Sequence, residues 1–294
     1  MRSFTLLVSL VVGFVLTSAS RPSAQLTTVA GTPRRIVSLV PSTTEMLFAI
    51  GAGPRLVGVG NYDHFPPDVE KLPRLGGLLD PNIESLIALR PDLVIVYDTQ
   101  TELRRQLERA GIPMWSYGIK GLGDVTNTIR TLGERVGLPA ASATVAARIE
   151  AQLGAVRARV AGRARPKTLL VFGREPGSLR GINASGGYGF MHDLVELAGG
   201  ADVLADVKQA AVSMSSEMVL ARAPEAIIEL HYGEGASTAS DEADRRVWLT
   251  LPSLPAVRSG RITLLTGSEF VVPGPRVVVA AERLARTLHP EAYR

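Results

Sequence analysis

Short apolar, β-branched runs alternate with helical patterns from Arg34 almost to the end of the chain. The apolar runs predict strands at Ile36–Val40, Leu56–Val59, Leu93–Tyr97, Met114–Tyr117, Thr168–Phe172, Ala226–Leu230 and Ile262–Leu265. Strands separated by helices are typical of parallel sheets that are covered by helices. The pattern therefore predicts an α/β fold with central parallel sheets.

The first predicted helix has a recognisable beginning and end. Ser42 and Glu45 lie three residues apart in the segment Ser-Thr-Thr-Glu, which matches a capping box. Gly51 and Gly53 follow, and glycine favours the carboxyl end of a helix. These two residues at the start are therefore expected to have a structural role.

The chain repeats part of its own sequence at an offset of 133 residues. The segment NIESLIALRPDLVIV (82–96) aligns with SSEMVLARAPEAIIE (215–229), which pairs Glu84 with Glu217. The same offset pairs Ile36 with Leu169, at the first strand of each half. Because one offset serves two separate segments, we predict two similar Rossmann-like lobes.

The segment between the two halves carries one amphipathic pattern. Its apolar residues recur at helical spacing, at Val145, Ile149, Leu153, Val156 and Val160. A helix over residues 140–162 is about 34 Å long at 1.5 Å per residue, enough to join two domains side by side. We therefore predict an N-terminal lobe at 34–138, one long rigid connecting helix at 139–164 and a C-terminal lobe at 166–290. A helix packed inside one domain is the alternative.

The amino terminus has the features of a secretory signal. An apolar run from Phe4 to Leu16 follows Arg2 and precedes small residues, and it is shorter than the roughly 20 residues of a membrane span. We assign residues 1–24 to a signal peptide, with an N-terminal anchor as the alternative. The chain has no cysteine, so it offers no site for N-terminal lipidation and no disulfide. These features predict an exported, soluble periplasmic protein without a lipid anchor.

The net charge of +4 does not point to nucleic acid. Six basic side chains against one acidic side chain in residues 148–167 account for the excess, and no nucleic-acid-binding motif accompanies them. We interpret this stretch as a solvated helix face and predict no nucleic-acid partner.

Residues for catalysis are scarce. The chain lacks a G-x-S-x-G elbow, a Walker loop and a cysteine nucleophile, and its four histidines (His64, His192, His231 and His289) form no local zinc motif. His64 and His231 lie just beyond strands and are the weak ligand candidates among them. We predict no enzymatic activity, no cofactor and no metal site, with an exported α/β enzyme as the distant alternative.

Aromatic residues gather in predicted loops and at strand ends. Ligands of open parallel sheets bind at the carboxyl ends of the strands, and rings supply broad apolar contact for a large, flat ligand. We therefore predict a cleft between the lobes lined by Tyr62, Phe65, Tyr97, Tyr188, Tyr232, Trp248 and Phe270. About half of such rings are expected to cover the sheet ends instead.

Glu84 and Glu217 occupy equivalent places in the repeat. If Asp80 and Ser213 cap their helices, each glutamate lies at the fourth helical position, too late for a capping box. Interaction with the helix dipole is one explanation. A two-point contact for a partner with two basic patches is the other, and we favour it because the repeat keeps the glutamate.

Four segments together resemble the periplasmic substrate-binding proteins of metal-chelate ABC importers, especially the cobalamin-binding branch: RRIVSLVPSTTEMLFAIGAGPRLVGV, YDHFPP, NIESLIALRPDLVIV and SSEMVLARAPEAIIE. The resemblance runs from Arg34 to His289. It implies two α/β lobes joined by one long helix, small closure motions, a ligand in the cleft between the lobes and docking on the permease through Glu84 and Glu217. It also implies that Leu78 lies in a loop facing the cleft.

That loop departs from the family. The cobalamin branch has an aromatic residue there and heme-binding relatives have an iron-ligating tyrosine, whereas this chain has Gly77-Leu78-Leu79-Asp80. The resemblance implies a monomeric receptor that delivers a corrinoid such as cobalamin to an ABC importer. A heme receptor, with Tyr62 or His64 as ligand, is an alternative. A ferric-siderophore receptor, using Arg174, Arg180 or Arg276, is another.

Overall fold

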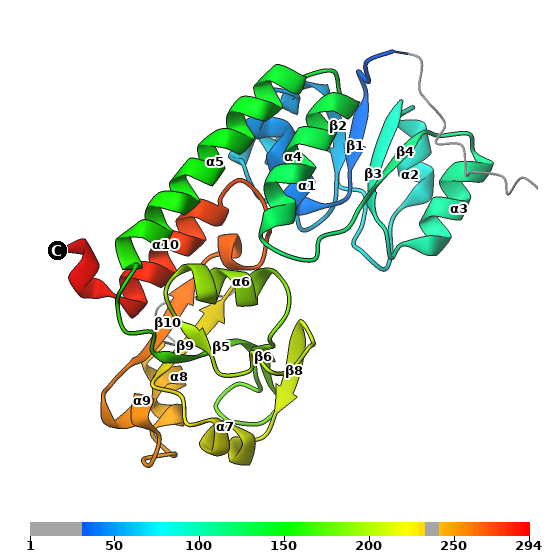
Figure 1. Cartoon of the computed structure of the whole chain (residues 1–294). Coiled ribbons are helices and arrows are strands. Elements are labelled where there is room, and N and C mark those ends of the chain that lie inside the picture. The colour runs from blue at the N-terminus through cyan, green and yellow to red at the C-terminus, as the bar shows by residue number, and fades with distance from the viewer. Residues whose placement is uncertain (1–30, 233–240) are drawn as a thin grey trace, which may run out of the picture.

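Two β-sheets, one in each of two lobes, form the framework of the molecule (Figure 1). The computed structural model describes residues 31–232 and 241–294, so the predicted signal peptide at 1–24 lies outside the described residues. Within the described residues, no helix combines the length and the apolar character needed to cross a bilayer.

The sheet of the N-terminal lobe is entirely parallel. Its strands run in the order β2 (Leu56–Val59), β1 (Ile36–Ser38), β3 (Leu93–Tyr97) and β4 (Met114–Tyr117). The helices of this lobe are α1 (Pro41–Ala49), α2 (Ile83–Ala88), α3 (Thr101–Arg109) and α4 (Gly123–Arg135), with short 3₁₀ turns η1 (Gly53–Arg55) and η2 (Pro67–Lys71). This arrangement agrees with the predicted parallel sheet.

The sheet of the C-terminal lobe is mixed. Its main path is β10 (Ile262–Thr266), β9 (Ala226–His231), β5 (Lys167–Gly173), β6 (Ile182–Ser185) and β8 (Ala211–Met214), and β7 (Ala201–Asp202) also pairs with β5. β5, β7, β9 and β10 pair in parallel, whereas β6 pairs antiparallel with β5 and β8. The expectation of a parallel sheet holds for four strands only, because the short link between β5 and β6 permits an antiparallel return but no parallel crossover.

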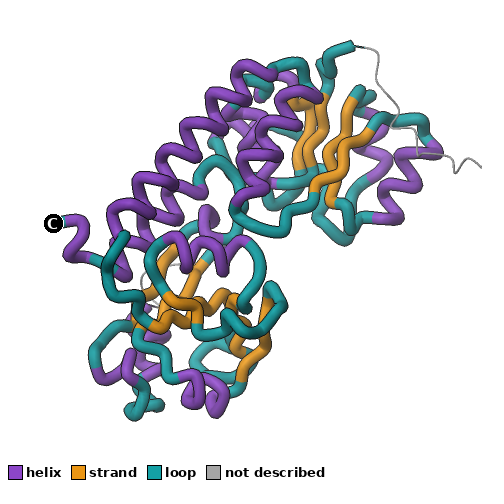
Figure 2. Tube along the Cα trace, in the orientation of Figure 1, coloured by secondary structure: helices purple, strands orange, loops and turns teal. Residues whose placement is uncertain are grey.

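The helices of the C-terminal lobe flank its sheet on both faces (Figure 2). They are α6 (Phe190–Leu197), α7 (Ser216–Arg222), α8 (Asp241–Trp248), α9 (Pro255–Arg258) and α10 (Val277–Leu288), with 3₁₀ turns η3 (Ser268–Phe270) and η4 (Pro290–Tyr293). The parallel strands β7-β5-β9-β10 repeat the order β2-β1-β3-β4 of the first lobe. The internal repeat seen in the sequence therefore corresponds to a repeated strand order.

A single apolar core extends through both lobes. It includes Ile36 and Leu93 from the first sheet, Leu170 and Ile228 from the second, and Ile149 from the long helix α5 (Pro139–Val160). Alternate strand residues face separate outer cores, one behind each sheet. Helices α5 and α10 pack together along this shared core (Figure 1). One face of each sheet thus contributes to this shared core.

Helix α1 begins differently from the prediction. Pro41 is its first residue, and Val40 precedes it without a side-chain cap. The hydroxyls of Thr43 and Thr44 donate to the Val40 carbonyl oxygen, at 2.9 and 3.3 Å. The proposed capping box of Ser42 and Glu45 is therefore wrong, because Glu45 is engaged by an arginine 231 residues away.

Candidate functional site

The segment that follows β1 contacts the segment that follows β10 between the lobes. Arg276, next to the amino end of α10, binds Glu45 of α1 through both carboxylate oxygens, at 2.5 and 3.0 Å. Only 3% of the Glu45 side chain is exposed. Burial raises the pKa of Glu45, and the Arg276 guanidinium opposes part of that rise. The carboxyl ends of the two sheets therefore adjoin the same region.

The absence of a side chain at Gly274 lets the backbone pass close to the Glu45 carboxylate. A β-carbon on Gly274 would lie 3.1 Å from Glu45 Oε2, closer than side chains ordinarily tolerate. A second contact joins the lobes where the Leu122 amide donates to Asp193 Oδ2 of α6, at 2.7 Å. The lobes are thus fastened at two places beside the shared core.

Three predicted ligand residues of the N-terminal lobe are exposed: Tyr62, Phe65 and Leu78. Tyr62, 71% exposed, lies against Gly77, where a β-carbon would be 3.3 Å from its ring. The Arg276 guanidinium lies 4.3 Å from the centre of the Phe65 ring, a cation–π contact between the lobes. All three side chains are thus accessible, and the Phe65 ring lies at a contact between the lobes.

Gln100 fixes the loop that carries Leu78. Its amide nitrogen donates to the Leu78 carbonyl oxygen at 2.9 Å, and its amide oxygen accepts from the Tyr97 backbone at 3.0 Å. Tyr97 itself is half-buried and packs edge-on against the buried Tyr117, with ring centres 5.8 Å apart. A cavity of about 490 Å³ opens beside this loop. Gln100 thus links the end of β3 at Tyr97 to the loop that carries Leu78.

Two predicted ligand residues of the C-terminal lobe are exposed and two are not. Tyr188 and Tyr232 are exposed, and the Tyr232 hydroxyl donates to the Phe172 carbonyl oxygen at 3.1 Å. Trp248 is buried on α8, where its indole nitrogen donates to Glu229 Oε2 at 2.8 Å. Phe270 is buried in the shared core. The expectation that these last two rings face the cleft is wrong, because both complete the apolar interior.

Asp63 is a feature of this region that sequence reasoning missed. It is 1% exposed, and neither carboxylate oxygen makes a hydrogen bond of normal geometry within the described residues. Burial raises its pKa to about 7, because desolvation outweighs the nearby Thr44 hydroxyl and Arg74 guanidinium. Arg74 instead donates to the carbonyl oxygens of Gly60 and Asp63. An ionisable group is therefore buried within the loop that carries Tyr62 and Phe65.

The arginines considered for an anionic chelate are engaged with carboxylates of this chain. Arg174 is almost fully buried and binds Glu229 and Asp244, at 2.9 and 2.7 Å. Arg180 is exposed and pairs with Glu175 at 2.8 Å. Arg276 holds Glu45, as described above. A site built from these three arginines would have to break existing ion pairs.

The four histidines also have partners. His64 pairs with Glu70 at 3.1 Å, and His231 approaches Glu229 at 3.3 Å. His192 binds Asp202 at 2.8 Å, and His289 is buried beside the Gly199 carbonyl oxygen. In the part of the chain that the structure describes, no three acidic or histidine side chains cluster in a way that could hold a metal ion.

Glu84 and Glu217 both lie exposed at the second position of their helices. The caps are Asn82, whose side chain accepts from the Ser85 amide at 2.9 Å, and Ser215, which accepts from the Met218 amide at 3.3 Å. The predicted caps Asp80 and Ser213 are therefore wrong, and the glutamates lie earlier in their helices than expected. The hydrogen bond from Ser215 lowers the pKa of Glu217.

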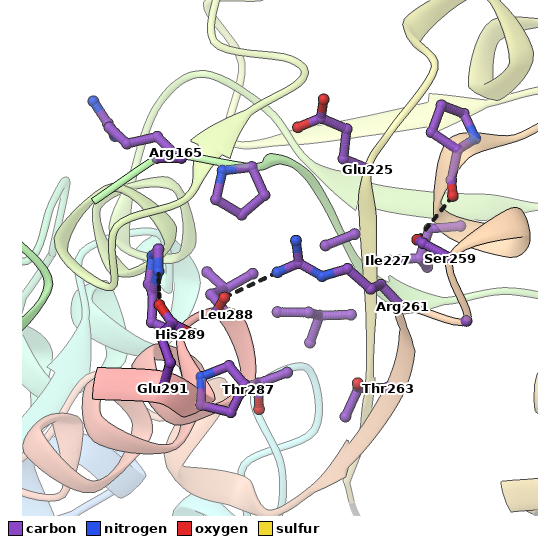
Figure 3. A pocket seen from close by; sticks show the side chains of 17 residues that line it. Arg165, Glu225, Ile227, Ser259, Arg261, Thr263, Thr287, Leu288, His289 and Glu291 are labelled. Atoms are coloured by element: carbon purple, nitrogen blue, oxygen red, sulfur yellow. Dashed lines mark hydrogen bonds and ion pairs between the residues drawn. The ribbon is translucent and has the colours of Figure 1, made fainter. Parts of the chain in front are cut away.

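A cavity of about 780 Å³ lies away from this region, at the amino ends of β5, β9 and β10 (Figure 3). Its polar side chains are used internally: Arg261 donates to the Leu288 carbonyl oxygen at 2.9 Å, and Glu225 accepts from the Lys167 amide at 2.9 Å. Ligands of parallel sheets bind at the opposite, carboxyl ends. We therefore take the region between the lobes as the candidate site.

Comparison with known proteins agrees with this geometry. The "Vitamin B12-binding protein" of Salmonella typhimurium is 29% identical over 256 residues, which cover 86% of this chain and 90% of the relative. The solved periplasmic vitamin B12-binding protein of Vibrio cholerae has a TM-score of 0.75 at 24% identity and covers 89% of this chain and 98% of its own. The periplasmic heme-binding protein of Roseiflexus sp. RS-1 gives 0.75 at 25% identity and covers 89% of this chain and all of its own.

The family comparison covers most of the molecule. A family model described as "Periplasmic binding protein" matches residues 36–268, which include the repeat, the connecting helix α5 and both sides of the candidate site. On this match, the chain belongs to the periplasmic binding protein family.

Proposed function

We propose that this protein is a periplasmic receptor that binds a corrinoid such as cobalamin between its lobes and delivers it to an ABC importer. The observation that carries the proposal is the similarity to vitamin B12-binding proteins, which extends over 86% of the chain. The receptor would bind and release its ligand without chemical change, with no resident cofactor, no lipid anchor and no nucleic-acid partner. It would act as a monomer.

Exposed side chains of both lobes are proposed to bind a large, partly apolar ligand. The N-terminal lobe contributes Tyr62, Phe65 and Leu78, and the C-terminal lobe contributes Tyr188 and Tyr232. Aromatic rings bury a large area at a small cost in side-chain entropy, and tyrosine adds a hydroxyl for polar groups at the ligand edge. Such surfaces suit a flat macrocycle with amide side groups.

Heme is the second candidate, supported by the structural similarity to a heme-binding protein. The exposed Tyr62 would be the iron ligand, since Leu78 has no atom that can ligate iron. His64 is the alternative ligand, since Glu70 contacts its Nδ1 at 3.1 Å and leaves Nε2 for iron. A ferric-siderophore receptor is the third candidate, and the existing arginine ion pairs make it less favoured.

A spectral titration tests the choice of ligand. Purified mature protein is titrated with cyanocobalamin, hemin and a ferric hydroxamate, following ligand absorbance and intrinsic fluorescence. We expect saturable binding of cyanocobalamin at micromolar concentration or below, and at least tenfold weaker binding of the others. Tyr62→Ala should weaken cyanocobalamin binding about tenfold, from the loss of one ring contact.

Tyr293→Ala is the matched control, because Tyr293 lies in η4 and packs against Arg159 and Arg286. It should bind as the unaltered protein does. Tight hemin binding with a shifted Soret band, lost in the Tyr62 variant, would instead identify a heme receptor.

Glu84 and Glu217 are proposed as the points that contact the permease. They lie in equivalent places in the two lobes and both are exposed. Carboxylates so placed orient a partner that carries two basic patches and speed its association. Since neither glutamate lies among the exposed rings of the candidate site, their replacement should leave ligand affinity unchanged.

A further inference from the structure

Helices α2 and α7 present the same order of exposed and buried positions. Ile83 and Ser216 are half-buried, and Glu84 and Glu217 are exposed. The following pairs are Ser85 and Met218, exposed; Leu86 and Val219, buried; Ile87 and Leu220, exposed; and Ala88 and Ala221, exposed. Every pair is separated by the 133 residues of the repeat. The two lobes therefore present two copies of one surface.

Each copy combines an acidic and an aliphatic side chain. Ile87 is 44% exposed and Leu220 is 38% exposed. Each lies three residues after its glutamate, and residues three apart are neighbours on one helix face. The buried residues Leu86 and Val219 belong to the outer cores of the two sheets. Both helices are thus anchored on the sheet faces that point away from the shared core.

We propose that each glutamate forms a docking pair with the aliphatic residue one turn later, Glu84 with Ile87 and Glu217 with Leu220. The two docking pairs bind two equivalent sites on the importer's permease, each with a basic residue beside an apolar hollow. The inference rests on the proposed role as an importer's receptor and adds the residues that give contact with the permease its affinity.

The chemistry of the docking pair explains why a glutamate alone is insufficient. An exposed carboxylate is screened by salt and contributes little to affinity by itself. An adjacent aliphatic contact excludes water from the ion pair and adds an apolar term that salt does not weaken. The glutamate therefore orients the partner, and the aliphatic residue slows its dissociation.

The repetition and the charge also limit the kind of partner. Two copies of one surface fit a partner that offers the same site twice, such as a pair of identical or similar subunits. A second copy of this chain fits poorly, because matching surfaces would bring carboxylate against carboxylate. The structure therefore favours a different protein with two basic sites.

The experiment measures binding of the receptor to its cognate permease in phospholipid nanodiscs, at 0.1 and 0.5 M NaCl. The variants are Ile87→Gln, Leu220→Gln, their combination, Glu84→Gln and Glu217→Gln. Val279→Gln is the control, since Val279 is an equally exposed aliphatic residue on α10, outside both docking pairs. Thermal unfolding and cyanocobalamin binding are recorded for every variant.

Each aliphatic variant should lose about tenfold in permease affinity, and by the same factor at both salt concentrations. The combined variant should lose more than either alone. Each glutamate variant should show a loss that shrinks at high salt. The control should bind the permease like the unaltered protein, and all variants should keep their stability and ligand affinity.

The outcomes separate the inference from the proposed function. Aliphatic variants that bind the permease normally, while the glutamate variants do not, would overturn the docking pairs and leave the receptor role intact. An unaltered receptor that never binds the permease would overturn both. Self-association lost in the combined variant, measured by analytical ultracentrifugation, would replace the permease with a second copy of the chain.

Discussion

At the scale of single residues, Asp63 is the most unusual feature of the structure. Its carboxylate folds back over Gly60, where a β-carbon would lie 2.9 Å from Oδ2. The Arg74 guanidinium donates to backbone oxygens and to Glu70 instead of to this carboxylate. Desolvation thus dominates, and it also raises the pKa of the neighbouring Tyr97 to about 12, with a smaller contribution from the charge of Asp63. The protein keeps a proton on a buried acid at mildly acidic pH.

This arrangement predicts that Asp63→Asn stabilises the protein at alkaline pH. The unfolded chain ionises near pH 3.8, whereas the folded protein holds the proton to about pH 7. The group therefore stabilises the folded state fully only below pH 4 and loses that contribution as the pH rises to 7. Relative to the native protein, the variant should gain on the order of 3 kcal/mol between pH 4 and pH 8, measured by urea unfolding.

The exposed Asp68 provides the comparison for this measurement. Asp68→Asn should change the free energy of unfolding only slightly, because this carboxylate is exposed. A stability difference for the Asp63 variant that does not change with pH would contradict the interpretation of a protonated buried acid.

Local sequence patterns predicted the exposure of some residues, but not burial that depends on distant segments. Exposure of Tyr62 and Tyr188 follows from their place in loops, so it was predictable. Burial of Trp248 and Asp63 depends on side chains from distant segments, such as Glu229 for the indole. A local pattern of polar and apolar residues contains no information about such partners.

At the scale of elements, α2 and α7 are two copies of one unit. Each begins with a side-chain cap, Asn82 or Ser215, and is followed by a non-glycine residue of positive φ, Arg90 at 46° or Ala223 at 47°. A proline and a strand of the sheet come next. Side chains other than glycine are strained in this left-handed conformation, at a cost of roughly 1–2 kcal/mol. The same strain is therefore present at the same place in both lobes.

Relief of that strain should be measurable. Arg90→Gly and Ala223→Gly should each raise the free energy of unfolding by about 0.5–1 kcal/mol, since the gain exceeds the added entropy of the unfolded chain. Arg105→Gly in α3 is the control and should lower it by about 1 kcal/mol, because glycine weakens a helix interior. Chemical denaturation measures all three. A lower free energy of unfolding for both glycine variants would contradict this, because it would show that the side-chain contacts of Arg90 and Ala223 outweigh the backbone strain.

The order of strands and helices was largely predictable, because hydrophobic periodicity and the 133-residue repeat are local signals. The antiparallel strands β6 and β8 were not predicted, since their segments are short and weakly apolar. Helix α1 was placed correctly, but its capping was misassigned because Glu45 is held by the other lobe. The existence of a helix or strand thus follows from local sequence, whereas its capping also depends on tertiary contacts.

At the scale of the whole molecule, the ion pair between Glu45 and Arg276 ties the lobes together. It joins residues 231 positions apart, is largely buried and adjoins the Phe65 ring. A buried ion pair is costly to break, because the remaining charge has lost both its partner and its water. This ion pair could not be predicted from the sequence, since its two residues lie far apart in the chain.

Arg276→Met should therefore destabilise the protein by about 3 kcal/mol or more, measured by urea unfolding. The double variant Glu45→Met with Arg276→Met should recover much of that loss, because no unpaired charge remains. Arg130→Met, which removes an exposed pair with Glu150 between α4 and α5, should cost far less. Equal losses for the single and the double variant would contradict a role for the buried charge.

The core shared by the two lobes has a consequence for ligand release in the proposed receptor. In a receptor whose lobes are joined by a flexible linker, thermal hinge motion alone can open the cleft. Here, spreading the halves would wet the side chains of α5 and α10 that they hold in common, a large free-energy penalty. Spontaneous separation of the lobes is therefore expected to be rare, so that in the proposed receptor ligand release requires a partner that acts on both lobes at once.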